Sequence, residues 1–272
     1  MIIDFHAHAF PDAIAEKAIT SLAETSGTKP YGNGTHSALC AHLEEAGIDL
    51  AVVLNIAVKP HQASRINTSA VSYDGLLSHD PANSRFIQFG SLHPLSPALE
   101  EDAIELKKMG LKGVKIHPDY QRLDLDDNRW SPLFELCTAL RLPVITHAGL
   151  DPLCPDHIHA TPKFIKKVLD NFPDLIFIAA HMGGVSCYDE AAEVLAGKYE
   201  NLYFDTAFVR SHATEEQCLR LIRAHGSERI LFGSDYPWDS SLSERRLIES
   251  LDITEREKEN ILGENAFKLL SL

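Results

Sequence analysis

The sequence predicts an α/β fold, a (β/α)8 TIM barrel formed by a single domain over residues 1–272. Eight short runs of β-branched, aliphatic and aromatic residues alternate along the chain with longer amphipathic stretches. The length of 272 residues is close to the ~250 residues of a typical barrel of this class. A GxGxxG motif is absent after the first run, so the alternative, an open nucleotide-binding sheet, has no support.

The expected strands are short and strongly apolar, as strands covered by helices on one face usually are. Because parallel neighbours need right-handed crossovers, we expect consecutive strands to pair in chain order. The eight runs are residues 2–5, 49–56, 85–92, 113–117, 142–147, 175–181, 202–206 and 229–235.

The expected helices begin and end with characteristic residues. Ser96 before Pro97 predicts one start, the Thr161-Pro162 pair predicts another, and Thr214 is a good N-cap for a third. Gly110 and Gly226 end two of these stretches, which is typical of helix ends. The stretches are residues 36–47, 96–110, 161–173, 214–226 and a last helix from 254 onward.

The composition excludes some classes of partner. The net charge of −14 disfavours nucleic acids and anionic membrane surfaces. A small anionic substrate is still compatible, because a metal ion or a few local cations can dominate a pocket. The chain contains no apolar run of about 18 residues, the length that a membrane-spanning helix needs.

The five cysteines are scattered and form no CxxC pair, which is typical of a reducing compartment. Near the N-terminus, Asp4 and His6 stand where a signal peptide would have its apolar core. We therefore expect a cytoplasmic protein.

Polar residues stand at the ends of several expected strands. His6 and His8 end the first run, His147 the fifth, His181 the sixth and Asp235 the eighth. Active sites of barrels are built at the carboxyl ends of the strands, so these side chains are expected at one rim. Imidazole and carboxylate donors with a free position are typical of catalytic zinc, although Mn, Fe, Co or Ni would also fit.

A regular first strand would direct alternate side chains to opposite faces. On that basis we expect Asp4, His6 and His8 to point into the barrel. Ile3 and Phe5 would then pack outward against the helices.

These residues lie in segments that resemble the amidohydrolase superfamily, and more closely its amidohydrolase-2 branch. That branch includes aminocarboxymuconate-semialdehyde decarboxylase, related aromatic-acid decarboxylases and pyrone-dicarboxylate lactonase. The resemblance covers the whole chain. The segments that carry it are IIDFHAHAFP at the start, GVKIHP at 113–118, PVITHAG at 143–149, FIAAHMGG at 177–184 and ILFGSDYPW at 230–238.

The resemblance implies one divalent metal ion, usually zinc, held by His6, His8, His147 and Asp235. His181 would contact the reacting water or substrate, whereas in binuclear relatives the matching histidine is a metal ligand. We favour the first role, with Asp235 and His181 as the catalytic residues.

Several further residues are candidates for binding the substrate. Lys115 ends the fourth strand, where some binuclear relatives carry a carboxylated lysine that bridges two metals. An unmodified lysine that pairs with a substrate carboxylate is favoured here, so a second metal at Lys115 is not expected. His117 lies on the same strand face, Arg210 follows the seventh strand, and Trp238 follows Asp235.

One loop carries a second HxH motif, His157 and His159, together with Cys154. No strand fixes the spacing of these histidines, so exposed loop residues are the favoured interpretation. Cys154 has no basic partner nearby in the sequence and is not favoured as a nucleophile.

The favoured function is a metal-dependent hydrolase of a small amide, ester or lactone, in which the ion activates water. The alternative is a non-oxidative decarboxylase of an aromatic or unsaturated acid, with Asp235 or His181 supplying a proton to carbon. A metal-stabilised binding protein without turnover is a third possibility, and the presence of His181 argues against it. The resemblance further suggests a homodimer.

Overall fold

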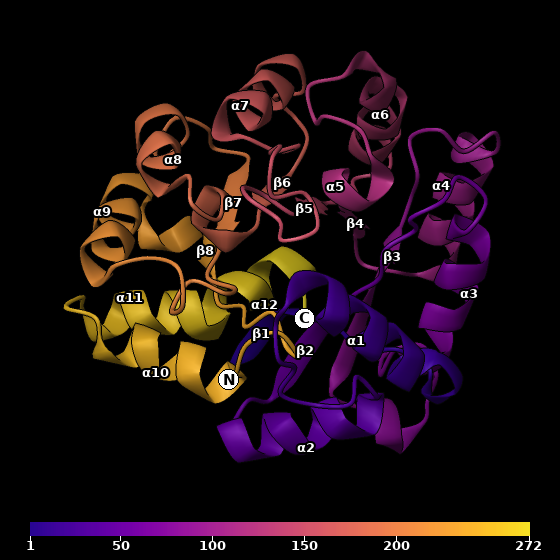
Figure 1. Cartoon of the computed structure of the whole chain (residues 1–272), viewed down its shortest axis with the longest axis horizontal. Helices are drawn as coiled ribbons and strands as arrows, with labels where there is room; N and C mark the ends of the chain where they lie inside the picture. Colours follow the sequence, from indigo (N-terminus) through magenta and orange to yellow (C-terminus); the bar gives the residue numbers. More distant parts are fainter.

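Eight parallel strands form one sheet in chain order in the computed structural model, which describes residues 1–272 (Figure 1). Backbone hydrogen bonds from Phe5 to Phe232 and from His8 to Tyr236, both 2.7 Å, join the first strand to the last segment and close the barrel. The strands are β1 (Ile3–Ala7), β2 (Leu50–Leu54), β3 (Phe86–Ser91), β4 (Val114–Ile116), β5 (Val144–Thr146), β6 (Phe177–Ala179), β7 (Leu202–Asp205) and β8 (Ile230–Leu231). The predicted fold class is therefore confirmed.

Helices surround this barrel, as Figure 1 shows. All five expected helical stretches are present, and the last one is interrupted by a π-helical turn at Asn260–Glu264. The helices are α1 (Asp12–Ser26), α2 (His36–Ala46), α3 (Ala63–Tyr73), α4 (Leu99–Met109), α5 (Pro118–Gln121), α6 (Ser131–Ala139), α7 (Pro162–Asn171), α8 (Tyr188–Val194), α9 (Glu215–His225), α10 (Ser241–Ser250), α11 (Glu255–Glu259) and α12 (Asn265–Leu270).

The predicted helix starts are correct at two positions and wrong at a third. Thr161 accepts a hydrogen bond from the backbone N–H of Phe164, and Thr214 forms a capping box. The start at Ser96 is wrong, because α4 begins at Leu99. The Ser96 hydroxyl donates to the Asp102 carboxylate instead, at 2.8 Å.

The prediction for the faces of β1 is right for His6 and His8, which line the pocket at the carboxyl end of the barrel, and wrong for Ile3, Asp4 and Phe5. Ile3 and Phe5 pack inside the barrel, in one buried apolar cluster with residues of β2, β3, β5, β6, β8 and α12. Asp4 points outward, where it accepts hydrogen bonds from the hydroxyls of Ser234 and Ser241. The register of β1 shifts between Asp4 and Ala7, so the two-residue period breaks before the histidines.

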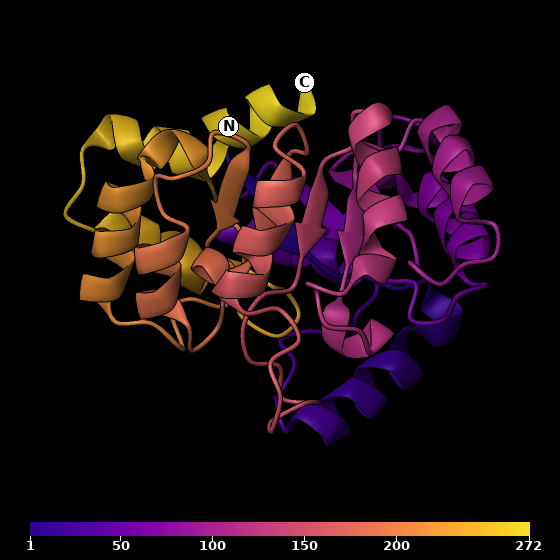
Figure 2. The same cartoon turned by 90° about the horizontal axis from the view of Figure 1, so that it is seen from above.

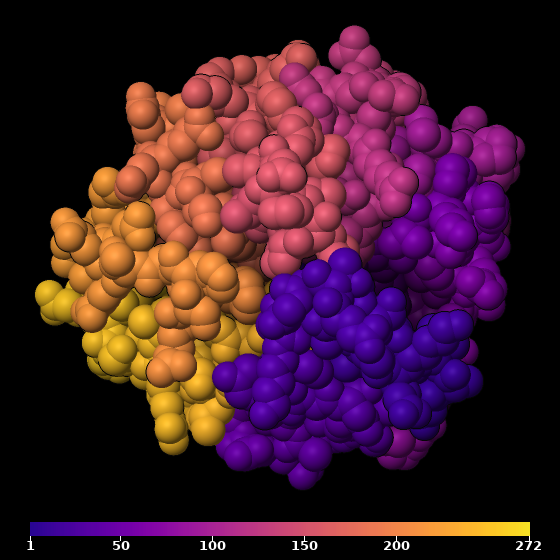
Figure 3. Space-filling view, viewed as in Figure 1, coloured from indigo at the N-terminus to yellow at the C-terminus, as the bar shows by residue number.

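The two ends of the barrel differ. Figure 2 shows α12, in yellow, across one end and the indigo α1 beyond the opposite end. The carboxyl ends of the strands face α1, and the space-filling view shows that α1 there meets the rose-coloured segment near residue 150 (Figure 3). No helix is both long enough and apolar enough to cross a membrane.

Candidate active site

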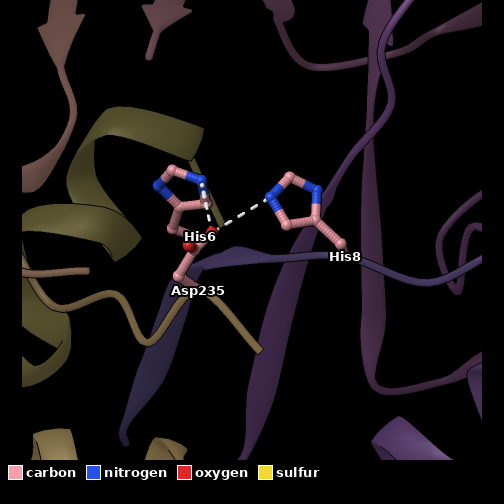
Figure 4. A group of neighbouring side chains, drawn as sticks. All are labelled: His6, His8 and Asp235. Carbon is pink, nitrogen blue, oxygen red and sulfur yellow. Dashed lines mark hydrogen bonds and ion pairs between the residues drawn. The ribbon is translucent and has the colours of Figure 1, made fainter. Parts of the chain in front are cut away.

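Two histidines at the end of β1 and one aspartate after β8 converge at the carboxyl end of the barrel (Figure 4). The Nε2 atoms of His6 and His8 lie 3.3 Å and 3.1 Å from the same oxygen, Oδ1 of Asp235. Burial alone raises the pKa of Asp235, but the contacts with His8 and His6 outweigh burial and lower it to about 2. The carboxylate is therefore ionised at neutral pH.

The other ring nitrogens of these histidines already have acceptors. Nδ1 of His6 lies 2.8 Å from Oδ2 of Asp205, and Nδ1 of His8 lies 3.0 Å from the carbonyl oxygen of Leu54. A neutral imidazole has one N–H, and donating it to these acceptors leaves a lone pair on each Nε2. Burial lowers the pKa of His6 well below its ordinary value, which favours that neutral form. In that form two lone pairs and a carboxylate oxygen face one another, an arrangement that a cation would stabilise. Without a cation, a proton on Nε2 of His8 bonds to Oδ1 of Asp235 and keeps the pKa of that carboxyl low.

His147 and His181 form the neighbouring pair. Nδ1 of His181 donates to the carbonyl oxygen of Ala207 at 2.8 Å, so its Nε2 accepts from Nδ1 of His147 at 3.1 Å. Nε2 of His147 consequently carries a lone pair, and this atom is buried without a hydrogen-bond partner. The structure groups His147 with His117 and Asp151 rather than directly with the other three predicted ligands.

Asp205 holds both halves of the site together. Its Oδ2 accepts from His6, while its Oδ1 accepts from the backbone N–H groups of His181 and Ala207 at 2.8 Å and 3.1 Å. Asp205 was not among the predicted site residues, although it is next to last in the seventh expected strand, residues 202–206. The end-of-strand rule that selected Asp235 would also have selected Asp205.

The site contains one buried cation. Nζ of Lys115, from β4, lies 3.3 Å from Nε2 of His6, and the side chain is 1% exposed. Burial lowers the pKa of Lys115 to about 8, against the opposing charges of Asp205, Asp235 and Asp151. At pH 7 the ammonium form predominates, so the floor of the site carries a positive charge beside the histidines.

His117 lies between the site and a second carboxylate. Its ring stacks on His147 at 4.4 Å between centroids and on Tyr120 at 3.7 Å. Nε2 of His117 is 3.5 Å from Asp151, a residue that the sequence did not single out. Burial, together with His147 and Lys115, lowers the pKa of His117 well below its ordinary value.

Two of the site residues adopt unusual backbone conformations. Asp235 and His181 have φ values of 67° and 58°, in the left-handed region that non-glycine residues rarely occupy. Because the chain turns at Asp235, the expected strand over 229–235 is regular only at Ile230–Leu231. A hydrogen bond from Asp235 N to the carbonyl of His6, 2.7 Å, fixes the turn. Strained backbone of this kind is common at functional sites.

The site opens into a pocket of about 530 Å³. Trp238 and His117 line it as predicted, whereas Arg210 is exposed and does not line it. Arg65 of α3, which the sequence did not indicate, does line it. The other lining residues include His6, His8, Lys115, His147, Asp151, His181 and Asp235 at the floor, and Phe10, Ile14, Leu22, Leu54, Ile56, Leu150 and Val185 along the walls.

The donor set fits a divalent metal ion. His6, His8 and Asp235 bring two Nε2 lone pairs and an ionised carboxylate within 4.8 Å of one another, in the neutral and deprotonated forms that metal binding requires. His147 carries a further Nε2 lone pair, which lies outside that group of three. Nitrogen and oxygen donors of this kind suit zinc and also manganese.

Comparisons with known proteins identify the family of the chain. The family model described as amidohydrolase matches residues 3–272. A curated relative, 2-amino-3-carboxymuconate-6-semialdehyde decarboxylase of Dictyostelium discoideum, is 27% identical over 233 residues. That match covers 72% of this chain but only 64% of the relative, so the chain aligns with less than two thirds of the relative's length.

Solved structures share the fold. An uncharacterised TIM-barrel protein of Bordetella bronchiseptica superposes with a TM-score of 0.78 at 21% identity, covering 99% of this chain and 98% of that one. The 5-carboxyvanillate decarboxylase of Novosphingobium aromaticivorans, complexed with manganese and 4-hydroxy-3-methoxy-5-nitrobenzoic acid, has a TM-score of 0.70 at 18% identity. That match covers 100% of this chain and 96% of that one.

Proposed function

The chain belongs to the amidohydrolase family, and from this premise we propose that it is a metal-dependent decarboxylase of a small unsaturated or aromatic carboxylic acid. From the sequence alone, hydrolysis was the favoured reaction and decarboxylation the alternative. Both named relatives with an assigned activity are decarboxylases, which supports the alternative over hydrolysis.

The observation that carries the proposal is the position of Lys115. Its ammonium lies at the floor of a pocket whose walls are largely apolar, 3.3 Å from His6. A substrate carboxylate would form a charge-assisted hydrogen bond with Lys115. The apolar walls suit the unsaturated remainder of such an acid and exclude water from it.

We propose that His6, His8, His147 and Asp235 hold one divalent ion, zinc or manganese. When bound, this ion supplies Lewis-acid chemistry by polarising oxygen atoms of the substrate. The residues around it are left with two tasks, which are to orient the carboxylate and to deliver a proton to carbon.

His181 is the proposed proton donor. Its Nδ1 is held by the carbonyl of Ala207, which aims Nε2 toward His147 and the pocket. In the resting site Nε2 accepts from His147, so His181 would first take up a second proton from water on Nε2. That proton would pass to the substrate carbon that carries the carboxylate, forming a C–H bond. The C–C bond then breaks, its electron pair returns to the unsaturated system, and CO2 leaves. Water restores the proton on His181, so one proton is consumed for each CO2 released.

The test is to incubate the metal-loaded protein with two panels of compounds, aromatic and muconate-like acids on one side and lactones and amides on the other. CO2 release from an acid, lost in His181→Ala and in His147→Ala, is the expected result. Release of protons from a lactone or amide, without CO2 from any acid, would establish the hydrolase instead.

A further inference from the structure

A second group of potential metal-binding side chains lies where α5 meets the loop over residues 151–160, which follows β5. Asp119 comes from α5, and Cys154 and His159 come from the loop. One ligand atom of each lies within 4.8 Å of the other two. None of the three residues lines the pocket or belongs to the cluster formed by His6, His8 and Asp235.

Asp119 is the unusual member of this group. The residue is 3% exposed, and neither carboxylate oxygen has a hydrogen-bond partner. The nearest basic group is Nδ1 of His117, 3.7 Å away, which is beyond hydrogen-bond distance. Burial and the nearby charge of Asp151 raise the pKa of Asp119 to about 7, partly offset by the backbone N–H groups of Asp119 and His159, which lie near the carboxylate but outside hydrogen-bond geometry. Buried carboxylates are normally paired or coordinate a metal, so Asp119 lacks a partner that a cation would provide.

One ring nitrogen of His159 has a partner outside the group, which leaves the other for a metal. Its Nδ1 lies 2.7 Å from Oδ1 of Asp124, so that nitrogen donates its proton to a carboxylate. The Nε2 atom then carries the lone pair. Histidines that bind metals commonly donate their other N–H to a carboxylate in this way, which fixes the ring and its tautomer.

Cys154 supplies a sulfur atom to the group. The thiol is half-buried and forms no disulfide. Binding of a metal deprotonates a coordinating thiol, and the released proton goes to solvent. The loop itself is closed at its base by backbone hydrogen bonds from Gly149 to Ala160 and from Leu125 to His159, so its side chains are presented from a fixed backbone.

We propose that Asp119, Cys154 and His159 form a second metal site, which would tie α5 to the loop over residues 151–160. The ligands suit a divalent transition-metal ion, in particular zinc. A sulfur, a nitrogen and an oxygen donor match the ligands that zinc takes, and a water molecule completes four-coordination. The neighbouring residues Leu150, Asp151 and Pro152 line the pocket, so an ion at this site would hold one wall of the pocket in place.

Cobalt provides a test that separates this site from the first one. The first site contains no sulfur, so absorption from thiolate-to-cobalt charge transfer, in the near ultraviolet, reports the second site alone. We expect the band when Co²⁺ is titrated into the full chain, and we expect it unchanged in His147→Ala. It should disappear in Cys154→Ser and persist in the control Cys187→Ser, which removes another half-buried thiol.

A second variant keeps the thiol in place. Asp124→Asn removes the carboxylate that orients His159. The Co²⁺ affinity, followed by titrating the thiolate-to-cobalt band, should fall about tenfold or more. Absence of the band in the wild-type chain would overturn the proposal whether or not any variant folds. A band that survives Cys154→Ser in a chain with wild-type circular dichroism would overturn it too. Neither result depends on whether the protein is a decarboxylase.

Discussion

Replacing Asp205 by asparagine should weaken metal binding at the first site without removing a ligand. Oδ1 of Asp205 accepts two backbone N–H groups, from His181 and Ala207, and Oδ2 accepts the Nδ1 proton of His6. In Asp205→Asn the remaining oxygen should stay with the two backbone donors, because an amide NH2 there would face two N–H groups. The NH2 group then faces Nδ1 of His6.

That exchange reverses the tautomer of His6. Nδ1 must become the acceptor, so the proton moves to Nε2 and occupies the lone pair that points at Asp235. Loss of such an orienting carboxylate typically costs 10- to 100-fold in metal affinity, which corresponds to about 1.4–2.7 kcal/mol.

The measurement is the apparent Kd for Mn²⁺ or Zn²⁺, from competition with a chelating dye. Asp74→Asn is the matched control, since Asp74 is also buried and accepts backbone N–H groups but lies away from the histidines. A folded Asp205→Asn protein with wild-type affinity would refute the reasoning about the tautomer.

Three further predictions concern the pocket, acid stability and one turn. Lys115→Met should raise KM for an acidic substrate about tenfold or more, because a charge-assisted hydrogen bond contributes about 1.5–3 kcal/mol; an unchanged KM in steady-state assays would exclude Lys115 from binding. Burial lowers the pKa of His225 to about 4 in the folded state, against about 6.5 in the unfolded chain. The stability that the neutral ring contributes above pH 6.5 is therefore lost as the pH falls from 6.5 through 4, by up to about 3 kcal/mol. Urea unfolding of His225→Phe should show a smaller loss of stability between pH 7 and pH 5 than the wild type, and an equal loss would contradict this. Gly149→Ala should lower the free energy of unfolding by about 2 kcal/mol or more, measured with urea, because φ is +85° and a Cβ would lie 2.1 Å from Val185 N. The control Gly27→Ala has a φ of +69° and no atom within 4 Å of its Cβ, so it should lower that free energy less. Equal losses in the two variants would show that the clash is absent.

The barrel could be predicted because it rests on local patterns. Each strand is a short apolar run, and the polar residues at strand ends identify the rim where the site forms. At the seventh strand the prediction selected Arg210, and the residue that reaches the site is Asp205, the fourth residue of that expected run. His147 shows the limit of the rule, because the end of a strand does not determine which neighbour a ring will contact. In the structure its Nδ1 bonds to His181.

Other features depend on long-range packing that no local pattern reports. The register shift in β1 places Phe5 and His6 on the same side of the strand, against the two-residue period. Arg210 follows a strand as expected, yet the loop turns its side chain to solvent. Arg65 reaches the pocket from α3, a helix that was not among the expected ones.

The most direct test of the metal centre, on which the proposed reaction depends, is an anomalous difference map from crystals of the full chain grown with Mn²⁺. We expect a peak within bonding distance of Nε2 of His6, His8 and His147 and of the Asp235 carboxylate. A map without a peak there, or with a peak bonded only to His181 and Asp205, would contradict the assignment of these four residues as the metal ligands.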